Sequence, residues 1–498
     1  MAGARILEKG GNVVDAAIAT SAVLSVTQNN LCGLGGDAFV LLKIAGRPVV
    51  NLNGSGRAFR GLTIEKFLMK GMNSIPLRGK GSVITVPGLV MAWHDLSEKY
   101  GTMEIKDLLR DAHHYALEGF PVTHNYSESI SLSSQFLGGY SNWRNTFLKD
   151  GLAPAPGTVF KQGDLANTLS ALMSDGLLSF YDGNLADRII NGLREEGVEI
   201  ASEDLARHRS TFQEPVKTEY RGFTVYETAP NSQAATVILW LNILSSMDRE
   251  PELKDVLLAG HAAYSQRDRY IADPESHPLP AFFTSREFAS DLARDLPHSS
   301  GGRISENRGD TTYFSITDAE GNSISMIQSN YLGFGSGIVP RGTGISFHNR
   351  GSYFTLDPRH HNALGPGKRT FHTLCAAMLE NEEGYTASLG SMGGDIQPQL
   401  HIQLILSLLK NRDDPQSVID APRWAFPYTI YEKPGHFLVE SDDYWKEIGA
   451  IFPDREIRNI GFSSQLGQAQ ITARLENGVV VGGADPRGDG FSVPMGDR

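Results

Sequence analysis

The chain has little cysteine, no excess of positive charge and no long apolar run. Its 498 residues include only two cysteines, Cys32 and Cys375, which excludes a disulfide framework and allows one bridge at most. The net charge is −12, from 45 basic against 57 acidic residues, and such a balance disfavours nucleic acid and anionic membranes. No apolar run approaches the roughly 18 residues of a membrane span. We therefore expect neither a nucleic acid nor a membrane as a partner.

The first residues lack the parts of an export signal. Met1 leads directly into Ala2–Glu8, a helix-like stretch that has neither a basic start nor an apolar segment of signal-peptide type. We expect a cytoplasmic protein on this basis. The abrupt start of the pattern leaves open whether another segment precedes it.

Motifs for common cofactors are also missing. The glycine cluster Gly33–Gly36 follows a helix-like stretch and precedes a strand-like one, the reverse of the order in a phosphate loop. Gly365–Thr370 has an arginine where a P-loop needs Ser or Thr. The pairs His113-His114 and His360-His361 are adjacent, and adjacent side chains point apart on helices and strands. With no HExxH and no paired CxxC, we expect no metal and no other cofactor.

The apolar patterns predict a mixture of helices and strands. Helical spacing predicts helices over 13–26, 105–118, 232–247 and 398–409, with further helices between 164 and 200. Alternation predicts strands over 38–44 and 48–52 and strand pairs within 218–228, 312–328 and 471–481. Two polar, turn-rich stretches are expected to be a long surface excursion (125–160) and a linker (297–310).

The predicted linker ends at a threonine that opens a strand, Thr311 in Gly309-Asp310-Thr311-Thr312. A threonine at the N-terminus of a chain is a strong nucleophile, because its own α-amine, with a pKa near 8, serves as the base. An internal threonine has no such base, so this chemistry requires cleavage between Asp310 and Thr311. The alternative is that Thr-Thr is ordinary strand composition, and the local sequence leaves both open.

Glycine is abundant, at 53 residues, and a second cluster spans Gly390–Asp395. It lies between a strand-like stretch and the helix expected to begin near Pro398. Consecutive glycines there could turn backbone N–H groups toward an oxyanion. A tight strand-to-helix turn would need glycine equally, so this cluster alone does not decide.

Several stretches together resemble the γ-glutamyltransferase family of N-terminal-nucleophile hydrolases. They are Gly10–Ala17, Gly33–Asp37, Val86–Gly88, Thr311-Thr312, Asp318–Asn322, Phe334–Gly337, Pro366–Arg369 and Met392–Gly394. The resemblance implies an α+β fold, a four-layer αββα sandwich, made as a proenzyme that cuts itself. Residues 1–310 would be the large fragment and 311–498 the small one, and the two together would form one αββα domain. A homodimer is left open.

By position, the resemblance implies four catalytic residues. Thr311 would be the nucleophile, and Asp310-Thr311 the cleavage site. Ser329 stands where the family has a threonine that steadies the nucleophile. Gly393 and Gly394 fall on the glycines of the oxyanion hole.

The positions implied for substrate binding depart from the family pattern. They are Arg57, Arg350, Tyr353, His372 and Thr373. Ser55 holds the place of an arginine that grips the donor α-carboxylate, and Arg57 lies two residues further on, which on a strand is the same face. Arg350 and Tyr353 replace a Gln and an Asp that receive the glutamyl α-amine, and His372 and Thr373 replace paired serines.

The pocket has thus lost a carboxylate that binds an ammonium group and gained a guanidinium, which favours a substrate carboxylate without an α-amine. The nearer resemblance is to a divergent branch with oxamate amidohydrolase and cephalosporin acylase-like proteins. The leading hypothesis is a self-processing threonine amidohydrolase that cleaves a small, carboxylate-bearing amide through an acyl-enzyme. The alternatives are a true γ-glutamyl hydrolase or transferase, with a glutathione-type substrate, and an uncleaved, catalytically silent binding scaffold.

Overall fold

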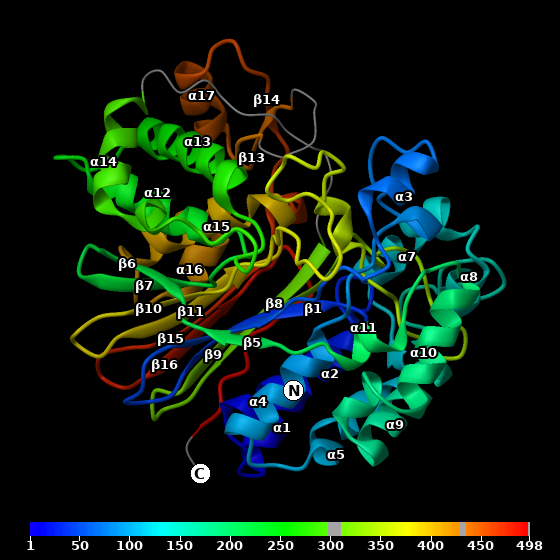
Figure 1. Cartoon of the computed structure of the whole chain (residues 1–498). Helices are drawn as coiled ribbons and strands as arrows, with labels where there is room; N and C mark the ends of the chain where they lie inside the picture. Colours follow the sequence, from blue (N-terminus) through cyan, green and yellow to red (C-terminus); the bar gives the residue numbers. More distant parts are fainter. Residues whose placement is uncertain (297–309, 428–434, 497–498) are drawn as a thin grey trace.

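Two β-sheets stack face to face, and helices cover the outer face of each sheet (Figure 1). The structure is a computed structural model, and it describes residues 1–296, 310–427 and 435–496. The four layers confirm the expected αββα sandwich.

Sheet I is antiparallel and has the strand order β5-β2-β1-β9-β8. Its strands are β1 (Asp37–Lys43), β2 (Val50–Gly54), β5 (Thr211–Gln213), β8 (Asp310–Thr317) and β9 (Ser323–Tyr331). The β8–β9 pair is the predicted hairpin, and β8 forms one edge of the sheet. The start of the predicted small fragment is therefore an edge strand.

Sheet II has the order β16-β15-β11-β10-β7-β6. Its strands are β6 (Val216–Tyr220), β7 (Phe223–Glu227), β10 (Ala377–Glu380), β11 (Thr386–Ser391), β15 (Ala469–Arg474) and β16 (Val480–Ala484). Small sheets outside this sandwich contain β3 (Phe120–Pro121), β4 (Val159–Phe160), β12 (Trp424–Ala425), β13 (Phe437–Val439) and β14 (Ile457–Asn459). The predicted strand pairs at 218–228 and 471–481 are thus both in sheet II.

The two-residue period of the strands separates the cores. On β1, Ala38 and Val40 pack with the helices outside sheet I, whereas Phe39 and Leu41 face sheet II. Tyr313 of β8 lies in the inter-sheet cluster with Phe39. Thr311, two residues before Tyr313, starts on the same inner side.

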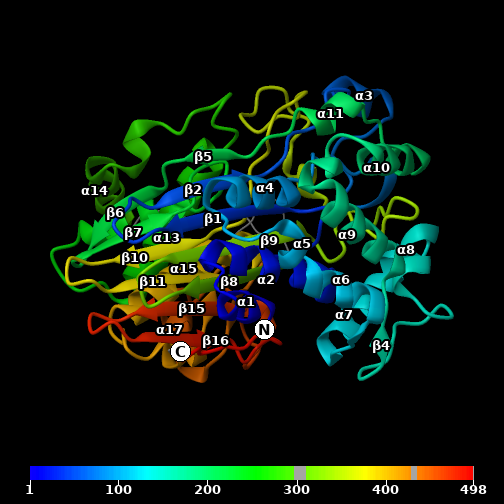
Figure 2. The ribbon, with the colours of Figure 1, turned by 90° about the horizontal axis from the view of Figure 1, so that it is seen from below.

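Helices of the first 206 residues lie on the sheet I side, and the later helices lie on the sheet II side (Figure 2). The first group is α1 (Ala2–Glu8), α2 (Val13–Thr27), α3 (Ile64–Met69), α4 (Leu89–Tyr100), α5 (Ile105–Leu108), α6 (Arg110–Glu118), α7 (His124–Leu137), α8 (Ser141–Phe147), α9 (Gly163–Asp175), α10 (Asn184–Glu195) and α11 (Ser202–Ala206). The second is α12 (Ala235–Ser245), α13 (Leu253–Tyr270), α14 (Arg286–Arg294), α15 (Gln397–Leu408), α16 (Pro415–Asp420) and α17 (Asp442–Ile451).

Two predictions about the first half of the chain are wrong. The helix expected over 105–118 is two helices, which meet at Leu109. The stretch 125–160 is largely the helices α7 and α8 and not a surface excursion. Tyr126 of α7 and Trp143 of α8 are buried there, because each helix has one apolar face toward the core, although Leu132 and Phe136 of α7 are exposed. The linker expected over 297–310 lies outside the described residues, except that Asp310 opens β8.

Three further expectations concern the two cysteines, the pair His360-His361 and membrane spans. Both Cys32 and Cys375 are buried and free. The rings of His360 and His361 stack at 4.1 Å, so these two side chains do not point apart, because they lie in a turn. No helix within the described residues is long and apolar enough to cross a membrane.

Candidate active site

Thr311 lies at an irregularity between the two last strands of sheet I. Asp310 pairs with Tyr331 and Thr312 with Gln328, so β9 has one extra residue opposite Thr311. The Thr311 hydroxyl is buried and donates a hydrogen bond to the Ser329 hydroxyl at 3.2 Å. The Ser329 oxygen also accepts the backbone N–H of Tyr331 at 2.7 Å. The bulge therefore brings the two predicted residues into direct contact.

Arg350 reaches the same serine from a short 3₁₀ turn (Arg350–Tyr353). Its Nη2 donates to Ser329 Oγ at 3.5 Å, and its Nη1 donates to Thr373 Oγ1 at 2.8 Å. The guanidinium lies 4.6 Å from the centre of the Tyr331 ring. It is only 1% exposed, and burial lowers its pKa. In the part of the chain that the structure describes, no carboxylate lies within ion-pair distance of this cation.

Two histidines and one aspartate lie near Arg350. His372 Nε2 lies 3.1 Å from Asp37 Oδ2, and the His372 ring packs on Phe39. His348 Nδ1 accepts the backbone N–H of Arg350 at 3.1 Å. Burial, with the charge of Arg350 in second place, lowers the pKa of His348 to about 3 and that of His372 well below its usual range. Both histidines are therefore neutral near pH 7.

Asp37 was not singled out from the sequence, although it directly follows the glycine cluster and opens β1. Its carboxylate is buried and accepts the N–H of Gly88 at 3.1 Å. Burial raises the pKa of Asp37 to about 7, and Arg350 opposes that rise. Asp37 is also the cross-strand partner of Ser329. The signal that could have found it is a charged residue placed at the start of an otherwise apolar strand.

Gly393 and Gly394 form the turn that leaves β11. Their φ angles are +143° and +57°, which side chains other than glycine rarely adopt. No acceptor among the described residues takes a hydrogen bond from either N–H. A Cβ on Gly390 would lie 2.4 Å from the Tyr313 ring, so the end of β11 packs against the start of β8. The turn is thus at the same end of the sandwich as Thr311, with two N–H groups available.

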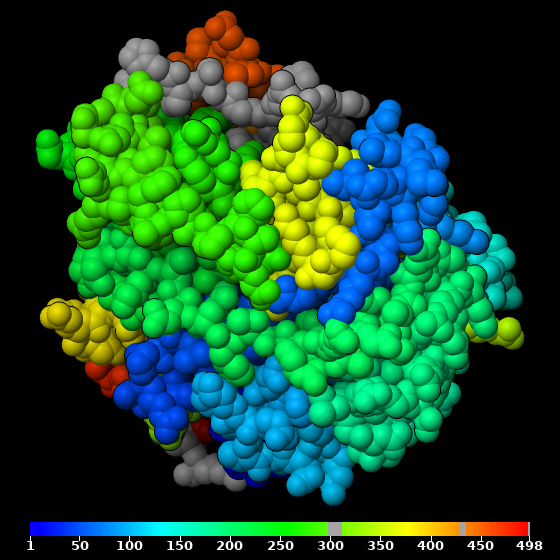
Figure 3. Space-filling view, in the orientation of Figure 1, coloured from blue at the N-terminus to red at the C-terminus, as the bar shows by residue number. Residues whose placement is uncertain are grey.

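Two predicted pocket residues have other partners. β2 ends at Gly54, so Ser55 and Arg57 are not on a strand, and the expectation that they share a face rests on a wrong assignment. The Arg57 guanidinium forms an ion pair with Glu275, an exposed residue. Figure 3 shows blue, green and yellow segments of the chain meeting on one face of the molecule. The Tyr353 hydroxyl donates to Asp395 at 2.7 Å.

The fold and this site together define the class. In this αββα sandwich, an edge strand of one of the two central sheets begins with Asp310-Thr311. This is the architecture of the N-terminal-nucleophile hydrolases. The gamma-glutamyltranspeptidase family matches residues 1–495, and the chain belongs to that family.

Individual relatives cover nearly the whole chain. The glutathione hydrolase-like YwrD proenzyme of Bacillus subtilis (strain 168) is 37% identical, covering 99% of this chain and 96% of its own length. The oxamate amidohydrolase proenzyme of Klebsiella pneumoniae is 33% identical, with 98% and 95% covered. A crystal structure of cephalosporin acylase from Bacillus halodurans has a TM-score of 0.91 at 34% identity, with 100% and 94% covered.

These relatives confirm the resemblance, including the divergent branch. One is named hydrolase-like, one an amidohydrolase and one an acylase, and two of the three are named proenzymes. The protein is therefore an enzyme of the gamma-glutamyltransferase-like hydrolase type.

Proposed function

We propose that this enzyme is a self-processing threonine amidohydrolase that acts on a small amide bearing a carboxylate. One observation carries the proposal: the Thr311 hydroxyl and the Arg350 guanidinium both donate to the hydroxyl of Ser329. Nucleophile and cation are thus separated by a single hydroxyl group. A substrate that contacts both must carry its carboxylate within a few bonds of the amide carbonyl.

Cleavage before Thr311 supplies the missing base. The freed α-amine accepts the hydroxyl proton as Thr311 Oγ attacks the amide carbonyl carbon. The N–H groups of Gly393 and Gly394 stabilise the oxyanion. The ammonium then donates its proton to the leaving amine, and an ester to Thr311 remains. The amine next accepts a proton from water, which attacks the ester, and the carboxylic acid leaves as Thr311 regains its proton.

Arg350 determines the kind of acyl group in this proposal. Among the described residues the buried Arg350 guanidinium has no carboxylate partner and is an incomplete ion pair, which a substrate carboxylate completes through two parallel hydrogen bonds. A γ-glutamyl group would bring its ammonium beside the same cation, which is unfavourable. The relatives named for oxamate and cephalosporin support an amide substrate. One relative is named glutathione hydrolase-like, so the experiment must also test a γ-glutamyl substrate.

Denaturing gel electrophoresis tests the self-processing step. Apportioning 54.3 kDa by 310 and 188 residues predicts bands at about 34 and about 20 kDa. The variant Thr311→Ala should give one band, while the neighbouring Thr312→Ala should still be cut. A single wild-type band that persists, together with no turnover of any amide, would establish the silent scaffold instead.

A panel of p-nitroanilides tests the substrate class. Oxalyl, succinyl and glutaryl anilides carry a carboxylate, and acetyl and butyryl anilides are matched neutral controls. Turnover should favour the carboxylated compounds over both the neutral ones and γ-glutamyl-p-nitroanilide. Equal or faster turnover of γ-glutamyl-p-nitroanilide would overturn this order and assign a γ-glutamyl hydrolase or transferase.

A further inference from the structure

Asp395, the residue after the two turn glycines, accepts hydrogen bonds from three side chains. Arg267 Nη1 donates to Oδ1 at 3.2 Å, and the Tyr353 hydroxyl donates to Oδ2 at 2.7 Å. The Tyr264 hydroxyl donates to the backbone carbonyl of Asp395 at 2.7 Å. All four side chains are buried. Both ends of this residue are therefore fixed, its carboxylate and its peptide group.

Gln233 joins the same turn to the pocket of Arg350. Its amide nitrogen donates to the carbonyls of Gly394 and Thr373, both at 2.9 Å. Its amide oxygen accepts Arg267 Nη1 at 2.6 Å. Since the Thr373 hydroxyl accepts from Arg350, a single buried side chain links the glycine turn to the guanidinium.

The hydrogen bonds that hold the turn join residues of the large fragment to residues of the small fragment. Gln233 lies just before α12, and Tyr264 and Arg267 lie on α13, so all three belong to residues 1–310. Gly394 and Asp395 belong to residues 311–498. The large fragment thus supplies the groups that hold the turn, while the small fragment supplies the turn itself.

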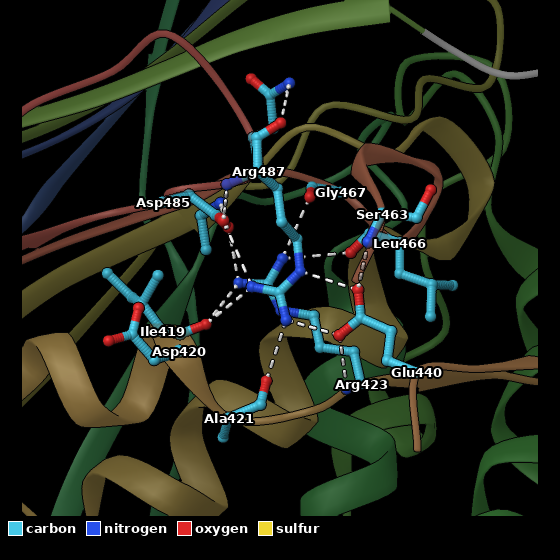
Figure 4. Close-up of polar contacts among 12 residues, drawn as sticks. Ile419, Asp420, Ala421, Arg423, Glu440, Ser463, Leu466, Gly467, Asp485 and Arg487 are labelled. Atoms are coloured by element: carbon cyan, nitrogen blue, oxygen red, sulfur yellow. Dashed lines mark hydrogen bonds and ion pairs between the residues drawn. The ribbon is translucent and has the colours of Figure 1, made fainter. Parts of the chain in front are cut away.

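The turn is also supported from within the small fragment. Arg423 Nη1 donates to the carbonyls of Leu466 and Gly467, and its Nη2 pairs with Asp485 at 2.6 Å (Figure 4). The loop that Arg423 holds packs on the turn, because a Cβ on Gly467 would lie 2.6 Å from the carbonyl oxygen of Met392. Arg423 therefore fixes the residue before Gly393, and the large fragment fixes the residues after it.

Two consecutive glycines have no side chains to restrict their rotation, and glycine is the most flexible residue of the backbone. An oxyanion site needs N–H groups that are already aimed before the charge develops. The rigidity must therefore come from the neighbouring peptides. The carbonyls of Gly394 and Asp395 are bonded to Gln233 and Tyr264, and these bonds limit how far the turn can rotate.

We propose that Gln233, Tyr264 and Arg267 are positioning residues that aim the N–H groups of Gly393 and Gly394 and hold them in register with the Arg350 pocket. The inference rests on the proposed function, because the orientation of these N–H groups affects the reaction only if the turn binds an oxyanion. It adds that the turn has its catalytic geometry only while the large fragment is in place. Arg267 and Asp395 strengthen the arrangement with a charge-assisted hydrogen bond.

The test compares two tyrosine variants in the full-length, processed enzyme. Tyr264→Phe removes one hydroxyl that donates to a backbone carbonyl. Tyr385→Phe removes another, which donates to the carbonyl of Arg412 at 3.3 Å at the opposite end of β11. We expect kcat for a carboxylated p-nitroanilide to fall about tenfold in Tyr264→Phe, less than for a direct oxyanion donor, with KM nearly unchanged. Tyr385→Phe should keep the wild-type kcat.

A charge series and a second readout complete the test. Arg267→Met should lower kcat more than Arg267→Lys, and both should slow self-cleavage of the proenzyme, measured on a gel. If the wild type hydrolyses the amide and Tyr264→Phe has the same kcat, the positioning role is overturned and the proposed function remains. Equal losses in the two tyrosine variants would show a general structural effect and would also overturn it. A wild type that neither cuts itself nor hydrolyses amides would overturn the proposed function, and this inference with it.

Discussion

The hydroxyl of Thr311 donates a hydrogen bond to the hydroxyl of Ser329 at 3.2 Å, across a bulge in β9. This hydrogen bond does not use the lone pairs of the Thr311 oxygen, which attack a carbonyl carbon in the mechanism that we propose. Ser329 is itself held by the backbone N–H of Tyr331, so the threonine has a fixed partner. The bond thus gives the Thr311 hydroxyl one orientation, which suits the nucleophile that we propose.

Removal of this partner should slow both reactions that we propose for Thr311. We expect Ser329→Ala to lower the rate of self-cleavage and the kcat for a carboxylated anilide by about 100-fold, the loss that follows when a reacting group is no longer held in place. Ser329→Thr keeps a hydroxyl and should retain most of the activity. A gel time course and a steady-state assay measure the two rates. Ser325→Ala is the matched control, because Ser325 is a buried serine of the same strand that donates to Ala377.

Substitution of Arg350 should change the choice of substrate. Arg350→Met leaves a bound substrate carboxylate without its partner, and we expect kcat/KM for succinyl or glutaryl p-nitroanilide to fall about 100-fold or more. Arg350→Lys should be intermediate, since a lysine cannot form two parallel hydrogen bonds. Butyryl p-nitroanilide has no carboxylate and should be nearly unaffected. If both substrates lose activity equally, Arg350 supports the fold of the site and does not bind the substrate.

Arg57 should matter much less than Arg350. Its guanidinium is partly exposed and is already paired with Glu275, and the free energy of such a surface pair is about 0–1 kcal/mol. We expect Arg57→Ala to change kcat/KM for the carboxylated anilides by less than about fivefold, the factor that corresponds to 1 kcal/mol. A loss as large as that of Arg350→Met would instead assign Arg57 to the substrate pocket.

Much of the fold could be predicted because local patterns agree with their surroundings. The helix α2 is apolar and buried on nearly all sides, and the apolar residues of the β8–β9 hairpin alternate in the sequence as those of strands do. The helices α7 and α8 could not be predicted in the same way. Their composition is polar, and Tyr126 and Trp143 mark a buried face only when the neighbouring helices are known.

The candidate site residues could be named one by one from the sequence, but not as a group. Thr311, Ser329 and Arg350 come from three separate segments, and only the fold shows that they share one hydroxyl. The error at Arg57 arose because the same-face argument treats Ser55 and Arg57 as part of a strand, whereas the alternation predicts a strand end at residue 52 and β2 ends at Gly54. The network around Asp395 was missed for a similar reason, since its partners on α13 lie more than a hundred residues away.

His208 gives a prediction about stability and pH. Its ring is buried and stacks on Tyr181 at 5.5 Å, and among the described residues its Nε2 has no hydrogen-bond partner. Burial, then the charges of Arg369 and Arg57, lowers the pKa of His208 to about 3. In the unfolded chain the pKa is near 6.5. The contribution of neutral His208 to stability is therefore complete above pH 6.5 and is lost as the pH falls toward 3.

His208→Phe should remove this dependence, because phenylalanine preserves the stacked ring and takes up no proton. The variant should be close to the wild type at pH 7 and gain relative stability below pH 6.5, by up to about 1.4 kcal/mol per pH unit. Thermal unfolding of both proteins at pH 7 and pH 5 measures the change. His114→Phe, at an exposed position of α6, should leave the pH dependence of the wild type unaltered. A difference between His208→Phe and the wild type that is the same at both pH values would show that His208 does not stay neutral in the folded protein.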